Sequence, residues 1–294
     1  MEPCMLCPRQ CNVDRQQQMG YCGGGGQMKI ARAMLHFGEE PCISGQHGSG
    51  AIFFSGCPLR CVFCQNHVIS QDNFGAEITV ERLANICLEL QEQGAQTLNL
   101  VSPTQYSSQI VQALERVKPQ LFIPVVYNTS GYETVVALRQ LEGLVNVYLP
   151  DFKYKSPELS KEYAAAENYF SVTSQAILEM FRQTGPYRLG TDGILQQGIM
   201  VRLLVLPGTR QDSKDIVHWL GTHFDKTDIL LSLMRQYTPE FYHGENKNLQ
   251  RRLTTFEYQQ VVDVAMDYGF QGYTQDKNSA TTAYTPDFNL EGVR

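Results

Sequence analysis

The sequence has no excess of basic residues and no long apolar run. Its 294 residues include 24 lysines and arginines against 30 aspartates and glutamates, a formal net charge of −6. Such a chain has no broad basic surface for a phosphate backbone, so nucleic acid is not an expected partner. No apolar stretch reaches the roughly 18 residues of a membrane span, and the first residues lack the pattern of a signal peptide. We therefore expect no membrane association and a cytoplasmic location.

Two further motifs are missing. The six histidines include no closely spaced pair of the kind that binds metals, so a separate histidine site is not indicated. The glycine run at 23–26 is not followed by the Lys-Ser/Thr ending of a phosphate-binding loop. These absences argue against histidine-bound metal and against nucleoside triphosphate chemistry.

The pattern from about residue 50 onward predicts an α/β fold. A hydrophobic content of 43% supports one large barrel or two modest domains. Short apolar strands alternate with helical stretches, as in β-α units around a parallel sheet. The predicted strands are residues 51–56, 97–102, 123–128, 145–150, 199–207 and 229–234. The predicted helices lie at 79–94 and near 105–117, 133–141, 173–184, 212–224 and 255–268.

Cysteines are concentrated at the N-terminal end. Seven of the nine fall in two groups within the first 64 residues, a pattern more typical of thiolate metal ligands than of a disulfide framework. The group Cys57, Cys61 and Cys64 directly follows the first predicted strand. In parallel barrels the loops at the carboxyl ends of the strands share one mouth, so a metal held here would face the active site.

Three thiolates at this spacing can bind three of the four irons of a 4Fe-4S cluster and leave the fourth iron open. Zinc is the main alternative, but structural zinc sites normally take four ligands. An open iron position permits substrate-type chemistry rather than electron transfer alone.

The stretch GCPLRCVFCQN, which holds these cysteines, resembles the CxxxCxxC signature of the radical S-adenosylmethionine (SAM) superfamily. The resemblance implies that SAM occupies the fourth iron and is cleaved to a 5'-deoxyadenosyl radical. A wider resemblance, to PflX-type proteins similar to pyruvate formate-lyase activating enzyme, is carried by CMLCPRQC, EEPCISG, PVVYNTSGYE, YLPDFKY and VRLLVLPG. It implies a partial (β/α)6 TIM-like barrel at 46–270, after an N-terminal cysteine-rich metal module at 1–45 and before a C-terminal tail at 271–294.

The same resemblance implies positions that face the cofactor. Phe63 stands where relatives touch the adenine. Ser102-Pro103-Thr104 replaces a Gly-Gly-Glu type segment, and Thr104 could still accept the methionine amino group. Further residues implied in cofactor or substrate binding are Asn128, Ser130, Asp151, Lys153 and Gln236. The alternatives are a core aromatic for Phe63, ordinary turn chemistry for Asn128 and Ser130, and a surface ion pair for Asp151 with Lys153.

Arg202 lies within the apolar run IMVRLLVLP, which otherwise reads as a buried strand. A guanidinium in such a strand needs an anion, because an unpaired buried charge is very costly. By analogy with activating enzymes, the SAM carboxylate is the predicted partner. An internal Asp or Glu is the alternative.

The second cysteine group comprises Cys4, Cys7, Cys11 and Cys22. Its segment has little apolar pattern and is predicted to be mostly loop, so a bound metal would be needed to order it. Both zinc and a second iron-sulfur cluster fit the four thiolates. The glycine-rich stretch around the last cysteine suggests a loop closed on a single fourth ligand, which favours zinc. Cys42 and Cys87 are predicted to be buried packing residues. The alternatives for Cys42 are a place on the approach to the cluster and the role of one N-terminal ligand.

The sequence therefore predicts a radical SAM enzyme that takes hydrogen from an unidentified substrate, possible substrates including a protein or peptide. An electron donor such as flavodoxin or ferredoxin is the expected partner. One alternative is an activating enzyme for a glycyl radical enzyme, although the N-terminal position of the extra cysteines argues against it. The alternatives of another class are an iron-sulfur electron-transfer protein and a metal-stapled interaction protein.

Overall fold

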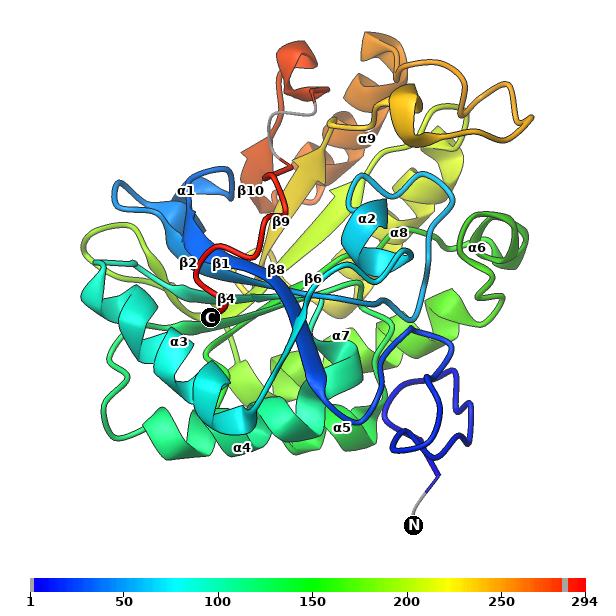
Figure 1. The fold of residues 1–294 in the computed structure, drawn as a ribbon. Helices are drawn as coiled ribbons and strands as arrows, with labels where there is room; N and C mark the ends of the chain where they lie inside the picture. Colours follow the sequence, from blue (N-terminus) through cyan, green and yellow to red (C-terminus); the bar gives the residue numbers. More distant parts are fainter. Residues whose placement is uncertain (1–2, 282–284) are drawn as a thin grey trace.

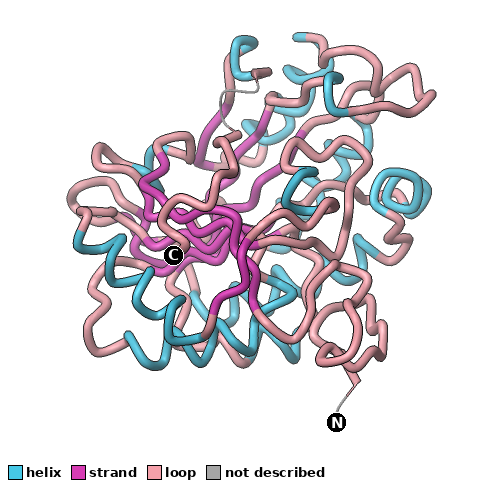
Figure 2. The backbone as a smooth tube through the Cα atoms, in the orientation of Figure 1, coloured by secondary structure: helices cyan, strands magenta, loops and turns pink. Residues whose placement is uncertain are grey.

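The computed structural model describes residues 3–281 and 285–294, and its centre is one mixed sheet. The strand order is β10-β9-β8-β6-β5-β4-β2-β1-β3, and β7 pairs with β8 outside this path. The strands are β1 (Met28–His36), β2 (Ser49–Phe54), β3 (Ala76–Ile78), β4 (Leu98–Val101), β5 (Val125–Thr129), β6 (Val147–Pro150), β7 (Arg188–Leu189), β8 (Leu195–Leu204), β9 (Ile229–Met234) and β10 (Gln271–Thr274). Figures 1 and 2 show these strands curving around the middle of the molecule, with helices outside.

The helices are α1 (Pro41–Ser44), α2 (His67–Ser70), α3 (Val80–Glu92), α4 (Ser107–Val117), α5 (Val135–Arg139), α6 (Pro157–Ala164), α7 (Tyr169–Thr184), α8 (Arg210–His223) and α9 (Thr255–Asp267). Three short 3-10 helices are η1 (Thr104–Tyr106), η2 (Pro239–Phe241) and η3 (Lys277–Ser279). Helix α3 packs on α4, α5 on α7 and α8 on α9. None of the helices in the described part of the chain is long and apolar enough to cross a membrane.

The six predicted strands correspond to β2, β4, β5, β6, β8 and β9, which are mutually parallel neighbours in the sheet. Strands β2, β4, β5 and β6 are buried along their whole length. Strands that are covered on both faces have largely continuous apolar sequences, so they could be predicted from the sequence. The α/β fold with a partial TIM-like barrel is therefore confirmed, and each predicted helix overlaps an observed one.

Two segments outside the predicted barrel also contribute strands. Residues 1–45 were predicted to be mostly loop, yet Met28–His36 forms β1, antiparallel to β2. The C-terminal segment 271–294 begins with β10, parallel to β9. Residues 288–293 then return to β1, where the Leu290 N–H donates to the Ala31 carbonyl at 3.0 Å. Figure 1 shows this segment crossing beside β1.

Residues 3–27 contain no regular strand or helix, as the lack of apolar periodicity predicted. Arg9 anchors this segment, since its Nε donates to the Pro58 carbonyl at 2.7 Å and its Nη2 to the Ala164 carbonyl at 2.8 Å. Both acceptors belong to the barrel, one of them within the loop that carries Cys57 and Cys61. The cysteine-rich segment is thus fixed against the predicted cluster loop, as Figure 1 shows at the N-terminal end.

Candidate active site

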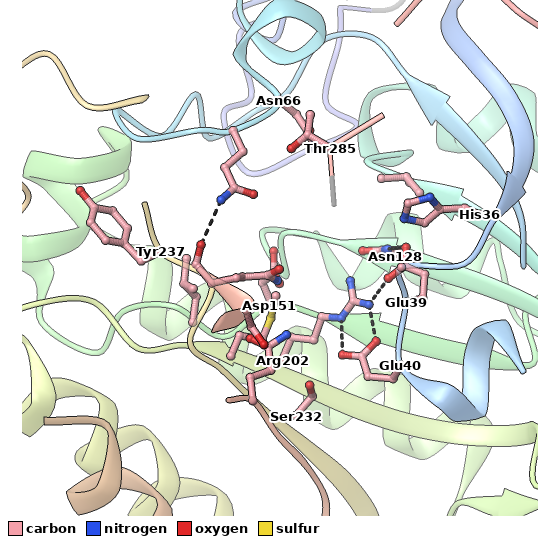
Figure 3. Close-up of a pocket in the computed structure, with 18 of the residues that line it drawn as sticks. His36, Glu39, Glu40, Asn66, Asn128, Asp151, Arg202, Ser232, Tyr237 and Thr285 are labelled. Atoms are coloured by element: carbon pink, nitrogen blue, oxygen red, sulfur yellow. Dashed lines mark hydrogen bonds and ion pairs between the residues drawn. The ribbon is translucent and has the colours of Figure 1, made fainter. Parts of the chain in front are cut away.

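A cavity of about 610 Å³ opens at the carboxyl ends of the parallel strands. Its wall takes residues from or just after the ends of the parallel strands, among them Phe53 of β2, Val101 of β4, Asn128 of β5, Asp151 after β6, Leu204 of β8 and Met234 of β9. This is the shared mouth that a parallel barrel presents, and Figure 3 shows its polar side chains pointing inward. Of the residues predicted at strand ends, Asn128 and Asp151 lie in this wall.

The cysteine loop runs from the end of β2 to α2 and forms one side of the cavity. Cys61 and Cys64 line the cavity, and the Cys64 N–H donates to the Cys61 carbonyl at 3.1 Å. The Leu59 N–H donates to the Cys57 sulfur at 3.5 Å, and the Ser70 hydroxyl to the Cys64 sulfur at 3.3 Å. The loop therefore already directs hydrogen-bond donors at sulfur, as metal-bound thiolates require.

Burial makes the Cys61 and Cys64 thiols hard to ionise without a cation. Burial, opposed by Lys153 and assisted by the neighbouring Cys57 and Cys64, raises the pKa of Cys61 to about 12. The pKa of Cys64 is raised in the same way, by burial and then by Cys57. Three mutually repelling soft donors beside a polar cavity fit an iron-sulfur cluster, whose irons supply the missing positive charge. In the described ranges, no three Cys, His, Asp or Glu side chains lie close enough together to bind one metal ion. An iron-sulfur cluster does not need such an arrangement, because each of its cysteine ligands binds a different iron.

Arg202, on β8, lies at the floor of the cavity and is nine-tenths buried. Its Nε donates to Glu40 Oε1 at 2.9 Å, and its Nη2 contacts both Glu39 and Glu40. Figure 3 shows the guanidinium between the two carboxylates. The structure thus pairs Arg202 with internal acids, the alternative to the predicted SAM carboxylate.

The two glutamates follow β1 and were not identified from the sequence. Although burial would raise the pKa of Glu40, Arg202 outweighs this effect and lowers it. Asn99 Nδ2 donates to Glu39 Oε1 at 2.8 Å, and Asn128 Nδ2 lies 3.5 Å from the same oxygen. The adjacent acidic pair in EEPCISG was the available signal. Its partner on β8 lies more than 160 residues away.

Asp151 and Lys153 form an ion pair at the cavity wall. Burial would lower the pKa of Lys153, but Asp151 and then the Cys61 thiol raise it well above its usual value. The ammonium group therefore stays charged close to a predicted cluster ligand. Side-chain exposures of 14% for Lys153 and 22% for Asp151 place the pair in the wall rather than on the open surface.

Phe63 and Gln236 also line the cavity. The Phe63 ring stands edge-on to Tyr237 at 5.6 Å and to Tyr163 at 6.2 Å, so an aromatic cluster holds it in the wall. The Gln236 carbonyl accepts from Gln65 Nε2 at 3.1 Å, which joins the loop after β9 to the cysteine loop.

Thr104 and Ser130 lie outside the cavity lining. Thr104 donates to Glu133 Oε1 at 2.5 Å, and Thr129 donates to the same oxygen at 2.5 Å. Burial raises the pKa of Glu133 to about 7. The Ser130 hydroxyl is buried without a hydrogen-bond partner. In this structure the Thr104 hydroxyl is bonded to the buried Glu133 carboxyl and does not face the cavity.

The N-terminal cysteines form a separate group. Cys7 and Cys22 are buried, whereas Cys4 and Cys11 are partly exposed. The Cys57 N–H donates to the Cys22 carbonyl at 3.0 Å, so the two cysteine loops touch. Cys42 and Cys87 are both buried, as predicted.

Comparison with known proteins finds similarity in the region that carries Cys57, Cys61 and Cys64. The family model of the radical SAM superfamily matches residues 51–183. An uncharacterized protein of Methanocaldococcus jannaschii is 29% identical over 275 residues, which cover 90% of this chain and 75% of that protein.

Two solved structures share the fold at low sequence identity. A radical SAM methyltransferase from Sphaerobacter thermophilus aligns with a TM-score of 0.52 and 10% identity, covering 77% of this chain and 66% of that one. Streptococcus suis SuiB bound to the precursor peptide SuiA aligns with a TM-score of 0.51 and 11% identity, covering 75% and 46%. The chain thus spans less than two thirds of each of these two proteins.

Proposed function

We propose, on the match of residues 51–183 to the radical SAM model, that the chain is an enzyme that reductively cleaves SAM and abstracts hydrogen from a substrate held in the cavity. The observation that carries the proposal is the loop of Cys57, Cys61 and Cys64, two of whose thiols line a cavity at the carboxyl ends of the parallel strands. A structural metal site would not need access to such a cavity.

The assigned cofactors are a 4Fe-4S cluster on these three cysteines and SAM on the open iron. When bound, they supply a one-electron reductant and a hydrogen-abstracting radical. The chain's own residues bind these cofactors, orient them and shield them from water. Phe63, held in the cavity wall by Tyr163 and Tyr237, offers an apolar ring of the kind that an adenine ring packs against.

Polar groups in the wall supply orientation. Asn128 presents an amide near Glu39, and Asp151 with Lys153 presents a charged pair near Cys61. The fixed positive charge of Lys153 favours a negatively charged cluster in this position. These groups would also hold the polar end of SAM away from bulk water.

The test uses the full chain reconstituted with iron and sulfide without oxygen. We expect SAM to shift the EPR signal of the reduced cluster and 5'-deoxyadenosine to accumulate. Cys61→Ala should reduce 5'-deoxyadenosine to background, because a ligand of the cluster is lost. Cys87→Ala, which removes a buried cysteine from α3, is the matched control and should keep the activity. Near-normal turnover in Cys61→Ala would disprove the assignment.

One alternative within this proposal, offered by the sequence likeness to activating enzymes, is that a protein glycine is the hydrogen donor. Mixing the loaded chain with a glycyl radical enzyme should then give a glycyl radical signal in the EPR spectrum. Its absence, with 5'-deoxyadenosine still formed, would assign a peptide or small-molecule substrate instead. A flavodoxin or ferredoxin is the proposed electron donor.

A further inference from the structure

The N-terminal cysteine loop and the radical SAM cysteine loop share a local geometry. In the N-terminal loop the Gly24 N–H donates to the Cys22 sulfur at 3.4 Å. In the other loop the Leu59 N–H donates to the Cys57 sulfur at 3.5 Å. In both cases the donor lies two residues after the cysteine. Hydrogen bonds of this kind stabilise negative charge on metal-bound sulfur and tune cluster potentials.

Two of the N-terminal sulfurs lie beside Gly20. A Cβ at Gly20 would lie 3.4 Å from the Cys11 sulfur and 3.6 Å from the Cys22 sulfur. A Cβ at Gly24 would lie 3.3 Å from the Cys22 sulfur, but it would first clash with the Arg15 guanidinium. The Cys11 and Cys22 sulfurs therefore lie on the same side of Gly20 and close to each other, as two ligands of one cluster must.

Backbone hydrogen bonds fold the N-terminal loop so that its cysteines come together. The Asn12 N–H donates to the Cys4 carbonyl at 3.2 Å, and the Gln10 N–H donates to the Cys7 carbonyl at 3.0 Å. Cys7 and Cys22 are buried. The four cysteines belong to a segment that has no helix or strand of its own, which is the situation of ligands awaiting a metal.

The two cysteine loops are in direct backbone contact. The hydrogen bond from the Cys57 N–H to the Cys22 carbonyl, at 3.0 Å, joins one cysteine of each group. Gly56 has a positive φ of 86°, and a Cβ there would clash with the same Cys22 carbonyl. Arg9 adds its hydrogen bond to the Pro58 carbonyl between Cys57 and Cys61. Within the described chain, none of residues 3–35 lines the cavity, so this contact approaches the cluster loop from outside the substrate space.

We propose that Cys4, Cys7, Cys11 and Cys22 hold a second iron-sulfur cluster, which relays electrons to the cluster on Cys57, Cys61 and Cys64. A low-potential one-electron protein carrier, of the flavodoxin or ferredoxin class, is oxidised by one electron as the N-terminal cluster is reduced. That cluster is reoxidised as the radical SAM cluster gains the electron. The assignment replaces the zinc that the glycine-rich loop suggested. The relay rests on the proposed function, whereas the second cluster does not.

The first test counts metals in full-length chains reconstituted without oxygen. Wild type should hold about eight irons and little zinc, and a Cys4→Ser/Cys7→Ser chain about four. A chain with Cys57, Cys61 and Cys64 all changed to alanine should also hold about four irons, with an EPR signal that SAM leaves unchanged. Cys42→Ala is the control and should retain about eight. About four irons plus one zinc in wild type would overturn the second cluster.

The second test separates the relay from the cluster. Reduction of the radical SAM cluster by reduced flavodoxin should slow at least tenfold in Cys4→Ser/Cys7→Ser, while reduction by dithionite stays unchanged. Equal rates with flavodoxin would overturn the relay. If that variant fails to fold, the triple alanine chain alone still decides whether the N-terminal cysteines hold iron. A wild type that binds about eight irons but shows no response to SAM would contradict the proposed function and leave the second cluster standing.

Discussion

Arg202 balances two carboxylates with a single guanidinium in a place where water is scarce. The side chains of Arg202, Glu39 and Glu40 are each only 10% exposed. Buried charges are tolerated when they are paired, and removing one partner leaves the others unpaired. The floor of the cavity therefore depends on this one residue for its electrostatic balance.

Replacing Arg202 by alanine should cost about 3–5 kcal/mol of unfolding free energy, because two buried carboxylates lose their counter-ion. Arg202→Lys should recover part of the loss, since an ammonium lacks the planar fork that serves both glutamates. Urea denaturation measures both changes. Combining Arg202→Met with Glu39→Gln and Glu40→Gln is the control and should regain stability. If the Arg202→Ala chain were as stable as wild type but unable to bind SAM, the SAM carboxylate would be the partner of Arg202, as the sequence predicted.

Glu133 gives stability a pH dependence of defined sign. Its folded-state pKa of about 7 lies above its usual 4.5 because of burial, so the folded state binds the proton more tightly. The stabilisation is complete below pH about 4.5 and is lost as the pH rises through about 7. Glu133→Gln keeps an oxygen that Thr104 and Thr129 can donate to, but it does not ionise.

The unfolding free energy of the Glu133→Gln chain should therefore fall less than that of wild type between pH 5 and pH 8, by about 3 kcal/mol at most. Denaturation at several pH values measures the difference. Parallel curves for the two chains would mean that Glu133 ionises normally when folded.

The residues of the cavity differ in how well the sequence could reveal them. Asn128 lies near the end of a buried strand and Asp151 directly follows one, so the rule for parallel strand ends was sufficient to place them. Neighbours along a strand point to opposite faces, and Thr129 therefore turns to Glu133 while Asn128 faces the cavity. Glu39 and Glu40 follow an antiparallel strand, and nothing local to them indicates Arg202.

At the level of elements, the parallel strands were predictable and β1 was not. A strand buried on both faces shows a continuous apolar run, as β2 does. Strand β1 mixes buried and partly buried positions and follows a long loop. Its place in the sheet is fixed by distant partners, β2 on one side and β3 on the other. Strand pairing between segments that are distant in the sequence leaves little signal in the local pattern of apolar residues.

The contact between the two cysteine loops can be tested at Gly56. Both Gly56 and Gly94 have a positive φ, 86° and 90°, but only at Gly56 would a Cβ meet another chain segment. Gly94→Ala should cost about 1–2 kcal/mol, the backbone strain alone. Gly56→Ala should cost more and should expose residues 3–27 to limited proteolysis, because the Cys22 carbonyl must move.

Unfolding free energies and proteolysis rates of the two alanine variants give the comparison. Gly94→Ala carries the same strain at the end of α3, so it isolates the contribution of the contact. Equal protection of residues 3–27 in both variants would show that the loops are not held together at Gly56.

Residues 288–293 connect the C-terminal segment to the first strand of the sheet. Residues 288–293 lie against β1, with the Ala33 N–H donating to the Glu291 carbonyl at 2.9 Å. Val293 is fully buried, and Arg82 of α3 donates to its carbonyl at 3.0 Å. The Phe288 ring lies edge-on to Phe53 at 5.6 Å, and Phe53 lines the cavity. The C-terminal segment thus supports the cavity wall from behind.

Removing residues 288–294 should therefore weaken both the fold and the site. Loss of the buried Val293 side chain alone is worth about 1.5–3 kcal/mol, and the lost contacts to β1 add to this. Val293→Ala is the matched variant: it should lower the unfolding free energy by a smaller amount and leave Phe288 in place. Because only the deletion removes the support of Phe53, only the deletion should also weaken SAM binding, measured by titration calorimetry on the reconstituted chain. If the deletion and Val293→Ala bind SAM equally well, the segment stabilises the sheet without shaping the cavity.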